Sequence, residues 1–231
     1  DMYSAYEAVF KRMELDFIAV QADAGAMAGS GSQTHEFQAL SDNGEDELVV
    51  CRNEKSAMNL EMAITKREPV TFEFNNNKYQ VVDTPQIDTI EKLTKFFSIP
   101  SYFFLKTLVF QAKKGDEEVI VLAVCLGDDE INPVKCANHL QLTQIQLASA
   151  ACLKKENFVN GYVGPLAAQL NTYVIIDSHI DINASYIVGA NKKDTHLKDV
   201  VAKRDFSKFI QHDIRKALPT DVSVKGNTIE F

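Results

Sequence analysis

The sequence lacks the features that mark membrane and secreted proteins. No apolar run approaches the roughly 20 residues that a transmembrane helix needs. The N-terminal residues carry charges where a signal peptide needs an apolar block. We therefore expect a cytoplasmic protein with no membrane partner. The chain also has no initiator methionine, which indicates a piece of a longer protein.

Metal-binding and nucleophilic motifs are also missing. The four cysteines show no CxxC pairing and no histidine at zinc spacing, so we expect free thiols and no metal site. Cys125 stands in an apolar, strand-like run, which is typical of a buried thiol. No serine–histidine–acid set or pair of carboxylates stands at convincing positions.

Excess positive charge is absent as well. The formal net charge of −8 argues against a non-specific nucleic-acid binder, because phosphate neutralisation dominates that kind of affinity. It leaves room for a local basic group that receives one particular RNA end. Hydrophobic residues make up 45% of the 231 residues, which is enough for one large domain or two modest ones.

The pattern of apolar residues predicts a mixture of helices and strands. Thr89 is a candidate N-cap, and Pro133 suits the first turn of a helix. We expect helices over residues 4–14, 89–97, near 133, over 148–158 and, weakly, over 206–218. We expect strands over residues 15–20, 34–40, 48–51, 79–85, 105–112, 119–127, 171–180 and 185–189, with a hairpin at 221–231. Without regular βαβ alternation, this predicts an α+β fold with a mixed, mostly antiparallel sheet.

Lys106 is the unusual residue of the run 98–110, which is otherwise apolar, aromatic, proline or small hydroxyl in type. Burying a cation in such a run is costly unless it reaches water or an anion. Taken alone, Lys106 is best interpreted as a lysine whose ammonium reaches solvent. Its sequence context changes that interpretation.

Residues 15–51 resemble the part of bacterial-type prolyl-tRNA synthetases that follows class II motif 2. In that family the strand carrying His35 and Glu36 borders the proline pocket, although a lone histidine beside a glutamate is most often structural. Residues 59–63 resemble the end of the same region. The matching positions are Ala19, Val20, Ala22, Asp23, Gly25, Gly29, His35, Glu36, Phe37, Leu40, Gly44, Glu45 and Asp46.

Other parts of that family have no counterpart in the sequence. Nothing resembles motif 1, the ATP-gripping arginine of motif 2, motif 3 or the anticodon-binding domain. The resemblance therefore implies that ATP and Mg serve the intact synthetase alone, and that this piece does not charge tRNA. The intact synthetase is expected to be a homodimer.

Residues 80–205 resemble the editing insertion of the same synthetases, which is shared with free-standing YbaK-type deacylases. Five blocks occur in order, which is a specific signal where any single block would be weak. They include VDTP, LKTLVF with Lys106, GDDEINPVK, GYVGP with Gly161, Gly164 and Pro165, and VIID followed by GANKKDTH with Asp177 and His196.

The resemblance implies hydrolysis of the ester that joins a mischarged amino acid, chiefly alanine, to the acceptor end of proline tRNA. That ester is already activated, so the reaction needs a positioned water and no cofactor. Lys106 is expected to hold a phosphate or ribose oxygen of the RNA end. Backbone N–H groups of the loop from Gly161 through Gly164 to Pro165 would cradle the ester, and His196 would bind the ribose.

The same resemblance assigns a substrate pocket. Ile90 and Leu93 share a helical face and match the family's alanine pocket, with Asp177 placed beside them. Phe104 departs from the family, which commonly has a small residue there. A phenyl ring on the same side of the strand as Lys106 is expected to narrow the pocket and to change its preference.

These observations predict three parts of the chain and leave three hypotheses. Residues 1–66 would be a remnant of the aminoacylation domain, 67–205 the editing domain, and 206–231 a segment that returns toward the catalytic domain. The main hypothesis is an editing fragment that deacylates weakly. The alternatives are an inactive RNA-end-binding module in which Phe104 closes the pocket, and a free-standing deacylase. The match of residues 1–66 disfavours the last.

Overall fold

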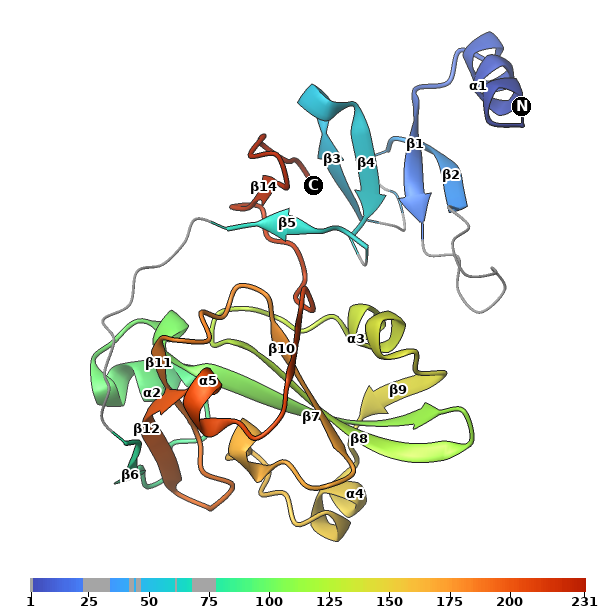
Figure 1. The fold of residues 1–231 in the computed structure, drawn as a ribbon. Coiled ribbons are helices and arrows are strands. Elements are labelled where there is room, and N and C mark those ends of the chain that lie inside the picture. The colour runs from blue at the N-terminus through green and yellow to red at the C-terminus, as the bar shows by residue number, and fades with distance from the viewer. Residues whose placement is uncertain (1, 23–33, 42–43, 45–46, 61, 68–77) are drawn as a thin grey trace. The chain divides into compact units, whose positions relative to one another are not determined.

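The computed structural model describes residues 2–22, 34–41, 44, 47–60, 62–67 and 78–231. The chain divides into two compact units (Figure 1). The smaller unit comprises Asp1–Glu68 with Lys216–Phe231, and the larger unit comprises Pro69–Arg215. Each unit is described separately. Of the positions that match the synthetase family, Asp23, Gly25, Gly29, Glu45 and Asp46 fall outside the described residues.

The smaller unit is built on a four-stranded sheet in the order β2-β1-β4-β3. Strands β1 and β2 are antiparallel, and β1 runs parallel to β4. The expected helix at 4–14 and strands at 34–40 and 48–51 are confirmed within two residues. The elements are α1 (Met2–Arg12), β1 (Phe17–Ala22), β2 (Thr34–Ala39), β3 (Leu48–Cys51), β4 (Ser56–Asn59), β5 (Thr65–Lys66) and, near the C-terminus, β14 (Val222–Ser223).

The C-terminal residues complete the smaller unit. Strand β14 pairs with β5, and Glu230 bridges Val50. Thr65 donates its hydroxyl hydrogen to Asp221 Oδ2 over 2.7 Å. Ile229 packs in a buried cluster with residues of β3 and the 60s segment. The larger unit ends at Arg215, whereas the sequence analysis placed the end of the editing domain at residue 205.

The larger unit contains a five-stranded sheet in the order β13-β10-β8-β7-β9. The β7–β8 hairpin and the β7–β9 pair are antiparallel, whereas β10 is parallel to both β8 and β13. The strands predicted at 105–112 and 119–127 are confirmed and form this hairpin, and the sheet is mixed as expected, with two antiparallel and two parallel pairs. The strands are β7 (Leu105–Lys114), β8 (Glu117–Leu126), β9 (Gln144–Leu147), β10 (Thr172–Asp177) and β13 (Ile210–His212).

A second, three-stranded sheet in the order β11-β12-β6 packs against the first. Leu105, Val109 and Leu122 face Val188 and Val200 across one core. The opposite face of the large sheet packs against helix α3 (Figure 1). The remaining elements are β6 (Gln80–Asp83), β11 (Ser185–Gly189), β12 (Thr195–Val201), α2 (Ile90–Phe97), α3 (Pro133–Leu140), α4 (Ala150–Lys155) and α5 (Ala202–Asp205), with short 3-10 turns η3 (Ser101–Phe103) and η4 (Pro165–Ala167).

Helix ends follow their sequence signals. Thr89 caps α2, because its side chain accepts a hydrogen bond from Lys92 N. Asn132 caps α3 by accepting from Val134 N and Lys135 N, with Pro133 in the first turn. None of the helices in the described part of the chain has the length and hydropathy that crossing a membrane requires.

The prediction of a weak helix over residues 206–218 is wrong. Residues 210–212 form β13 instead, and Ile210 pairs with Ile175 of the buried strand β10. Ile214 N then donates to Asp177 Oδ2, which continues the extended course of the chain. Pairing with a central strand therefore outweighed the local helical pattern. The four cysteines are free thiols, and three of them are buried.

Replacing the cap of α3 tests this local argument. Asn132→Ala removes the acceptor for two backbone N–H groups, so we expect the free energy of unfolding to fall by about 1 kcal/mol. Lys154→Ala, a truncation at an exposed position inside α4, should cost less than about 0.5 kcal/mol. Urea unfolding of both variants checks this, and equal losses would contradict the capping role.

Candidate functional site

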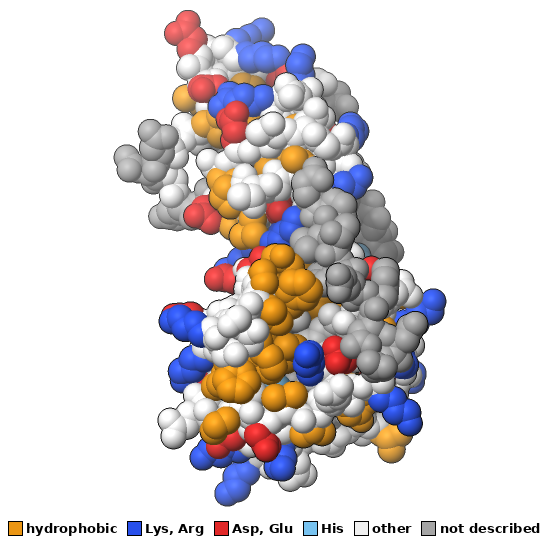
Figure 2. Space-filling model, turned by 90° about the vertical axis from the view of Figure 1, so that its left-hand side faces the viewer, with side chains coloured by type: hydrophobic (Ala, Val, Ile, Leu, Met, Phe, Trp, Pro, Cys, Tyr) orange, Lys and Arg blue, Asp and Glu red, His pale blue; other side chains and the backbone are white. Residues whose placement is uncertain are grey.

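A cavity of about 500 Å³ lies at the open edge of β7. Strand β9 pairs with β7 from Phe110 to Lys113, so residues 105–109 face the cavity rather than another strand. On this side of the larger unit, Figure 2 shows hydrophobic side chains gathered in a continuous band. The lining residues come mainly from α2, β7, β11, β12 and the loop before η4, and they include Ile90, Leu93, Lys106, Thr107, Asn160, Gly161, Val163, Gly189 and His196.

Lys106 lies on the cavity wall and is half-buried. Its ammonium donates a hydrogen bond to the backbone carbonyl of Asp129, in the turn that follows β8. This contact fixes the long side chain and leaves further N–H donors of the ammonium for a ligand. The lysine is therefore anchored within the site and does not simply extend into solvent.

His196 lies on β12 and is 3% exposed. Burial lowers the pKa of its imidazole to about 4, so the ring is neutral at pH 7. Nδ1 shares a hydrogen bond of 2.6 Å with the hydroxyl of Thr84, which fixes the orientation of the ring. Nε2 then offers one hydrogen bond to a ligand in the cavity.

The loop from Gly161 to Pro165 packs directly on the end of β11. A Cβ atom at Gly164 would lie 1.8 Å from the carbonyl oxygen of Gly189. A Cβ atom at Gly189 would in turn lie 2.3 Å from Tyr162 O. Neither position accepts a side chain, so the two glycines fix how closely the loop approaches the strand. Pro165 is buried at the start of η4.

Helix α2 supplies the apolar wall. Leu93 is 4% exposed and Ile90 is half-buried, and both line the cavity. Asp88 lines the entrance and forms an ion pair of 2.6 Å with Lys92, one turn along. The hydrogen bond from Lys92 lowers the pKa of the Asp88 carboxyl.

Phe104 lies outside the cavity lining, so the expectation that its ring narrows the pocket is wrong. Its side chain is 0% exposed and packs with Leu93 and Ile187 in a separate buried cluster. The ring of Phe97 lies 6.0 Å away between centroids. Helix α2 therefore covers the phenyl group, which supports the apolar wall from behind.

Asp177 is also outside the lining, at the end of β10, with β8 between it and β7. Its carboxylate accepts hydrogen bonds from His179 N and Ile214 N, each over 2.9 Å, and contacts His179 Nδ1. Burial opposes its ionisation, but these hydrogen bonds together outweigh burial and lower the pKa. Asp177 therefore holds the chain around β13 and does not line the pocket.

His35 and Glu36 lie on β2 of the smaller unit, and both are exposed. The ring of Tyr3 packs edge-on against His35 at 5.7 Å between centroids. Glu36 accepts a hydrogen bond of 2.9 Å from Gln38 Nε2. Their assignment to a proline pocket stays a prediction.

The structure adds cavity residues that the motifs did not single out. Thr107 follows Lys106 directly and lines the same cavity, as do Asp88, Asn160 and Val163. Thr107 and Val163 stand inside the LKTLVF and GYVGP blocks, which was the available signal for them. Asp88 and Asn160 come from loops whose course a periodic pattern does not give.

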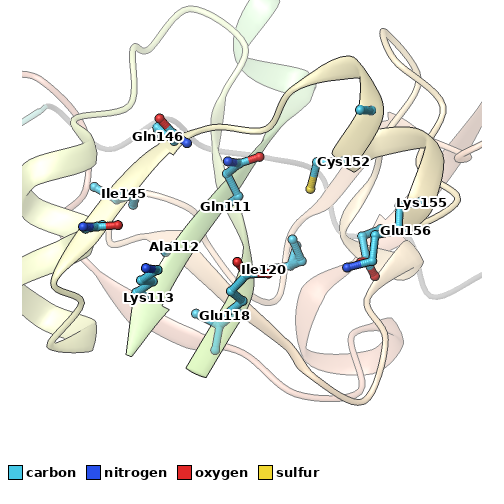
Figure 3. Close-up of a pocket in the computed structure, with 13 residues that line it drawn as sticks. Gln111, Ala112, Lys113, Glu118, Ile120, Ile145, Gln146, Cys152, Lys155 and Glu156 are labelled. Carbon is cyan, nitrogen blue, oxygen red and sulfur yellow. The ribbon is translucent and has the colours of Figure 1, made fainter. Parts of the chain in front are cut away.

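A larger groove of about 710 Å³ lies elsewhere on the larger unit. Figure 3 shows its side chains arriving from the strands on one side and from α4 and the following residue on the other. None of the residues that the motifs select lines this groove. Volume alone is therefore a poor guide to the site, and the smaller cavity holds the candidate chemistry.

Comparison with known proteins agrees with this placement. Residues 84–206 match the family model described as an aminoacyl-tRNA editing domain. The chain belongs to this family. All the cavity residues named above lie within the matched range of the editing domain.

Similarity to curated proteins extends beyond the editing domain on both sides. The chain is 37% identical over 222 residues to a proline–tRNA ligase of Brachyspira hyodysenteriae, which covers 96% of the chain and 38% of that protein. It is also 37% identical over 229 residues to a proline–tRNA ligase of Legionella pneumophila. That alignment covers 98% of this chain and 39% of the relative. The chain thus spans well under half the length of these relatives.

A solved structure shares the fold of the editing domain. It is described as a putative trans-editing enzyme for prolyl tRNA synthetase, and it aligns with a TM-score of 0.52 at 15% identity. The alignment covers 60% of this chain and 87% of that one. At this identity the likeness supports the fold of the larger unit.

The close contact between Gly164 and Gly189 gives a stability test. Gly164→Ala or Gly189→Ala places a methyl group inside a backbone contact, so each should lower the free energy of unfolding by about 2 kcal/mol or more. Because both changes open the same contact, the double variant should lose less than the sum of the two. Strict additivity in urea unfolding would contradict a shared contact.

The buried neutral His196 predicts a pH dependence. Its pKa is about 4 in the folded state and about 6.5 when unfolded, so below pH 6.5 the unfolded chain binds the extra proton. Stability should therefore fall between pH 6.5 and 4, by up to about 3 kcal/mol from this group. Unfolding curves of wild type and His196→Asn should differ in this window, and parallel pH profiles would contradict the assignment.

Proposed function

We propose that this chain hydrolyses the ester of alanine mischarged onto the acceptor end of proline tRNA. The observation that carries the proposal is the meeting of Lys106, His196 and the loop at Gly161 on one cavity. These groups come from β7, β12 and the segment before η4, which are far apart in the sequence. The family of the chain and the names of its relatives support the same substrate class.

The geometry suits an activated ester better than a reaction that needs a nucleophilic side chain. Burial raises the pKa of Cys125, so its thiol stays protonated. An ester carbonyl needs a water held nearby and donors for the developing negative charge. We propose that the ammonium of Lys106 holds an oxygen of the RNA end, with no cofactor required. The neutral ring of His196 then binds the ribose through Nε2.

The cavity walls support a small aliphatic amino acid. Ile90, Leu93 and Val163 provide apolar surface at the same cavity as Lys106. A methyl side chain gains by leaving water against such a wall, whereas a charged side chain loses its hydration there. We therefore propose alanine as the main amino acid removed, and cysteine as the second amino acid to be tested. We propose ligation of proline and dimer formation for the full-length relatives, and not for this chain.

An inactive RNA-end-binding module is the second candidate, but the structure removes the observation that favoured it. That hypothesis depended on Phe104 closing the pocket, and Phe104 packs behind α2 instead. A free-standing deacylase is disfavoured by the similarity to proline–tRNA ligases outside residues 84–206.

Removing the amine of Lys106 tests the proposal. We expect the chain to deacylate alanine-charged proline tRNA and cysteine-charged proline tRNA, slowly, since it spans part of its relatives. Lys106→Ala should lower the rate about 10- to 100-fold, the range expected for a lost hydrogen bond from a charged group. The measurement is release of labelled amino acid with time.

Lys113→Ala is the matched control, because Lys113 lies on the same strand and outside the cavity. It should leave the rate within about two-fold of wild type. Activity that survives the loss of the Lys106 amine would remove the role proposed for it. No deacylation by the wild-type chain at any concentration would favour the binding module.

A further inference from the structure

Asp88 is the acidic group of the cavity. It lies in the loop before α2, and its side chain is 48% exposed, so a ligand can reach it. Among the described lining residues, Asp88 is the one carboxylate and Lys106 is the one ammonium, while the ring of His196 is neutral at pH 7. The cavity therefore carries one charge of each sign on different walls. The proposed binding of the RNA end uses the positive charge and leaves the negative one without a role.

The carboxylate of Asp88 is ionised and remains open to a ligand. The hydrogen bond from Lys92 lowers its pKa, and a place just before the N-terminus of α2 also favours a negative charge. Lys92 contacts Oδ1 over 2.6 Å, whereas a carboxylate accepts about four hydrogen bonds in all. Lys92 is itself 51% exposed, and an ion pair between exposed groups contributes little to stability. A ligand cation can therefore share Asp88 with Lys92, or replace it, at small cost.

Asp88 lies between the two parts of the site that are expected to hold the aminoacyl group. A Cβ atom added at Gly161 would lie 3.3 Å from Asp88 Cβ, so the side chain of Asp88 begins directly against the loop expected to cradle the ester. Ile90, which begins α2 and its apolar wall, follows two residues later. The carboxylate is thus placed where the loop meets the wall.

The chemistry of an alanyl ester fits this arrangement. Its α-carbon carries the ester carbonyl, a methyl group, an ammonium and a hydrogen. With the carbonyl at the loop of Gly161 and the methyl group against Ile90 and Leu93, the ammonium is left for the region between them, where Asp88 lies. A cation that leaves water needs an acceptor, and a carboxylate is the strongest one a side chain offers. The phosphate of the RNA end supplies the opposite charge for Lys106.

We propose that Asp88 is a specificity-determining residue that binds the α-ammonium of the aminoacyl ester. This rests on the proposed deacylase function. An RNA end without an amino acid has no ammonium, and an ester of a hydroxy acid has none either. The contact therefore selects esters of amino acids with a free amino group.

Removing the charge of Asp88 and the charge of the ligand separately gives the test. Asp88→Asn keeps the shape of the side chain and should lower kcat/KM for alanine-charged proline tRNA about five- to ten-fold, since a partly exposed charged contact is worth less than a buried one. Proline tRNA charged with lactate, whose hydroxyl replaces the amino group, should lose less than about two-fold. The measurement is release of labelled acid with time for both esters and both proteins. A folding defect would lower both rates equally, so equal losses overturn the inference.

Glu91→Gln is the matched control. Glu91 forms an ion pair of the same length, 2.6 Å, with Lys95 one turn along, and it is outside the cavity lining. This change should leave both rates within about two-fold of wild type. Lys92→Met removes the partner of Asp88 and should keep the preference for the alanyl ester. An equal loss of preference in Lys92→Met and Asp88→Asn would assign the effect to the ion pair and overturn the inference.

Binding separates this inference from the proposed function. A non-hydrolysable, amide-linked alanyl-adenosine should bind the wild-type chain more tightly than its propionyl counterpart, which lacks the amino group. Asp88→Asn should remove most of that difference. A wild-type chain that shows this preference without hydrolysing the ester would refute the proposed function and keep the inference. Hydrolysis by the wild type with the same preference in Asp88→Asn would overturn the inference while the proposed function stands.

Discussion

The open edge of β7 is the constraint on which the site depends. A strand edge with unpaired backbone groups attracts other strands, and folded proteins normally cover it. Here β9 pairs with the second half of β7, while Phe104 bridges Ile187 just before the first half. The residues between these two closures are left to the cavity. Helix α2 and the loop at Gly161 form the other walls, so the edge is covered without being paired.

The rest of the larger unit holds these walls at fixed distances. The contact of Gly164 with Gly189 joins the loop to β11, and Asn191 N donates to Tyr162 O over 2.7 Å beside it. Thr84 fixes the ring of His196, and the carbonyl of Asp129 fixes the ammonium of Lys106. Lys106 and His196 are thus each held in place by a second residue. Their side chains therefore lose less conformational freedom when a ligand binds.

Local signals in the sequence were sufficient for some elements and not for others. Helix α2 combined an apolar face with a capping threonine, and the β7–β8 hairpin joined two apolar runs through a polar turn. Strands β9 and β13 are short, and β13 exists because it pairs with β10. No pattern within residues 210–212 could show a partner more than 30 residues away.

The site shows the same division. The resemblance to editing domains named Lys106, His196 and the glycine loop, and the fold brings them to one cavity. Strand alternation placed the ring of Phe104 on the side of Lys106, but it could not show what covers that side. The resemblance assigned Asp177 to the pocket without giving its place in the sheet. A helix covers Phe104, and an intervening strand separates Asp177 from β7. Thr107 stands inside the LKTLVF block, but the sequence could not show that it lines the cavity.

Charge explains why the few contacts at the aminoacyl end matter. The chain carries a net charge of −8, so long-range attraction does little to bring RNA to it. Among the described residues that line the cavity, Lys106 is the one lysine or arginine. In the proposed mode of binding, Lys106 and His196 contact the RNA end and the ribose, which the product keeps. The apolar wall of Ile90, Leu93 and Val163 contacts the amino acid, which the product has lost. Discrimination between charged and uncharged tRNA in this proposal therefore depends on the wall, together with the carboxylate of Asp88.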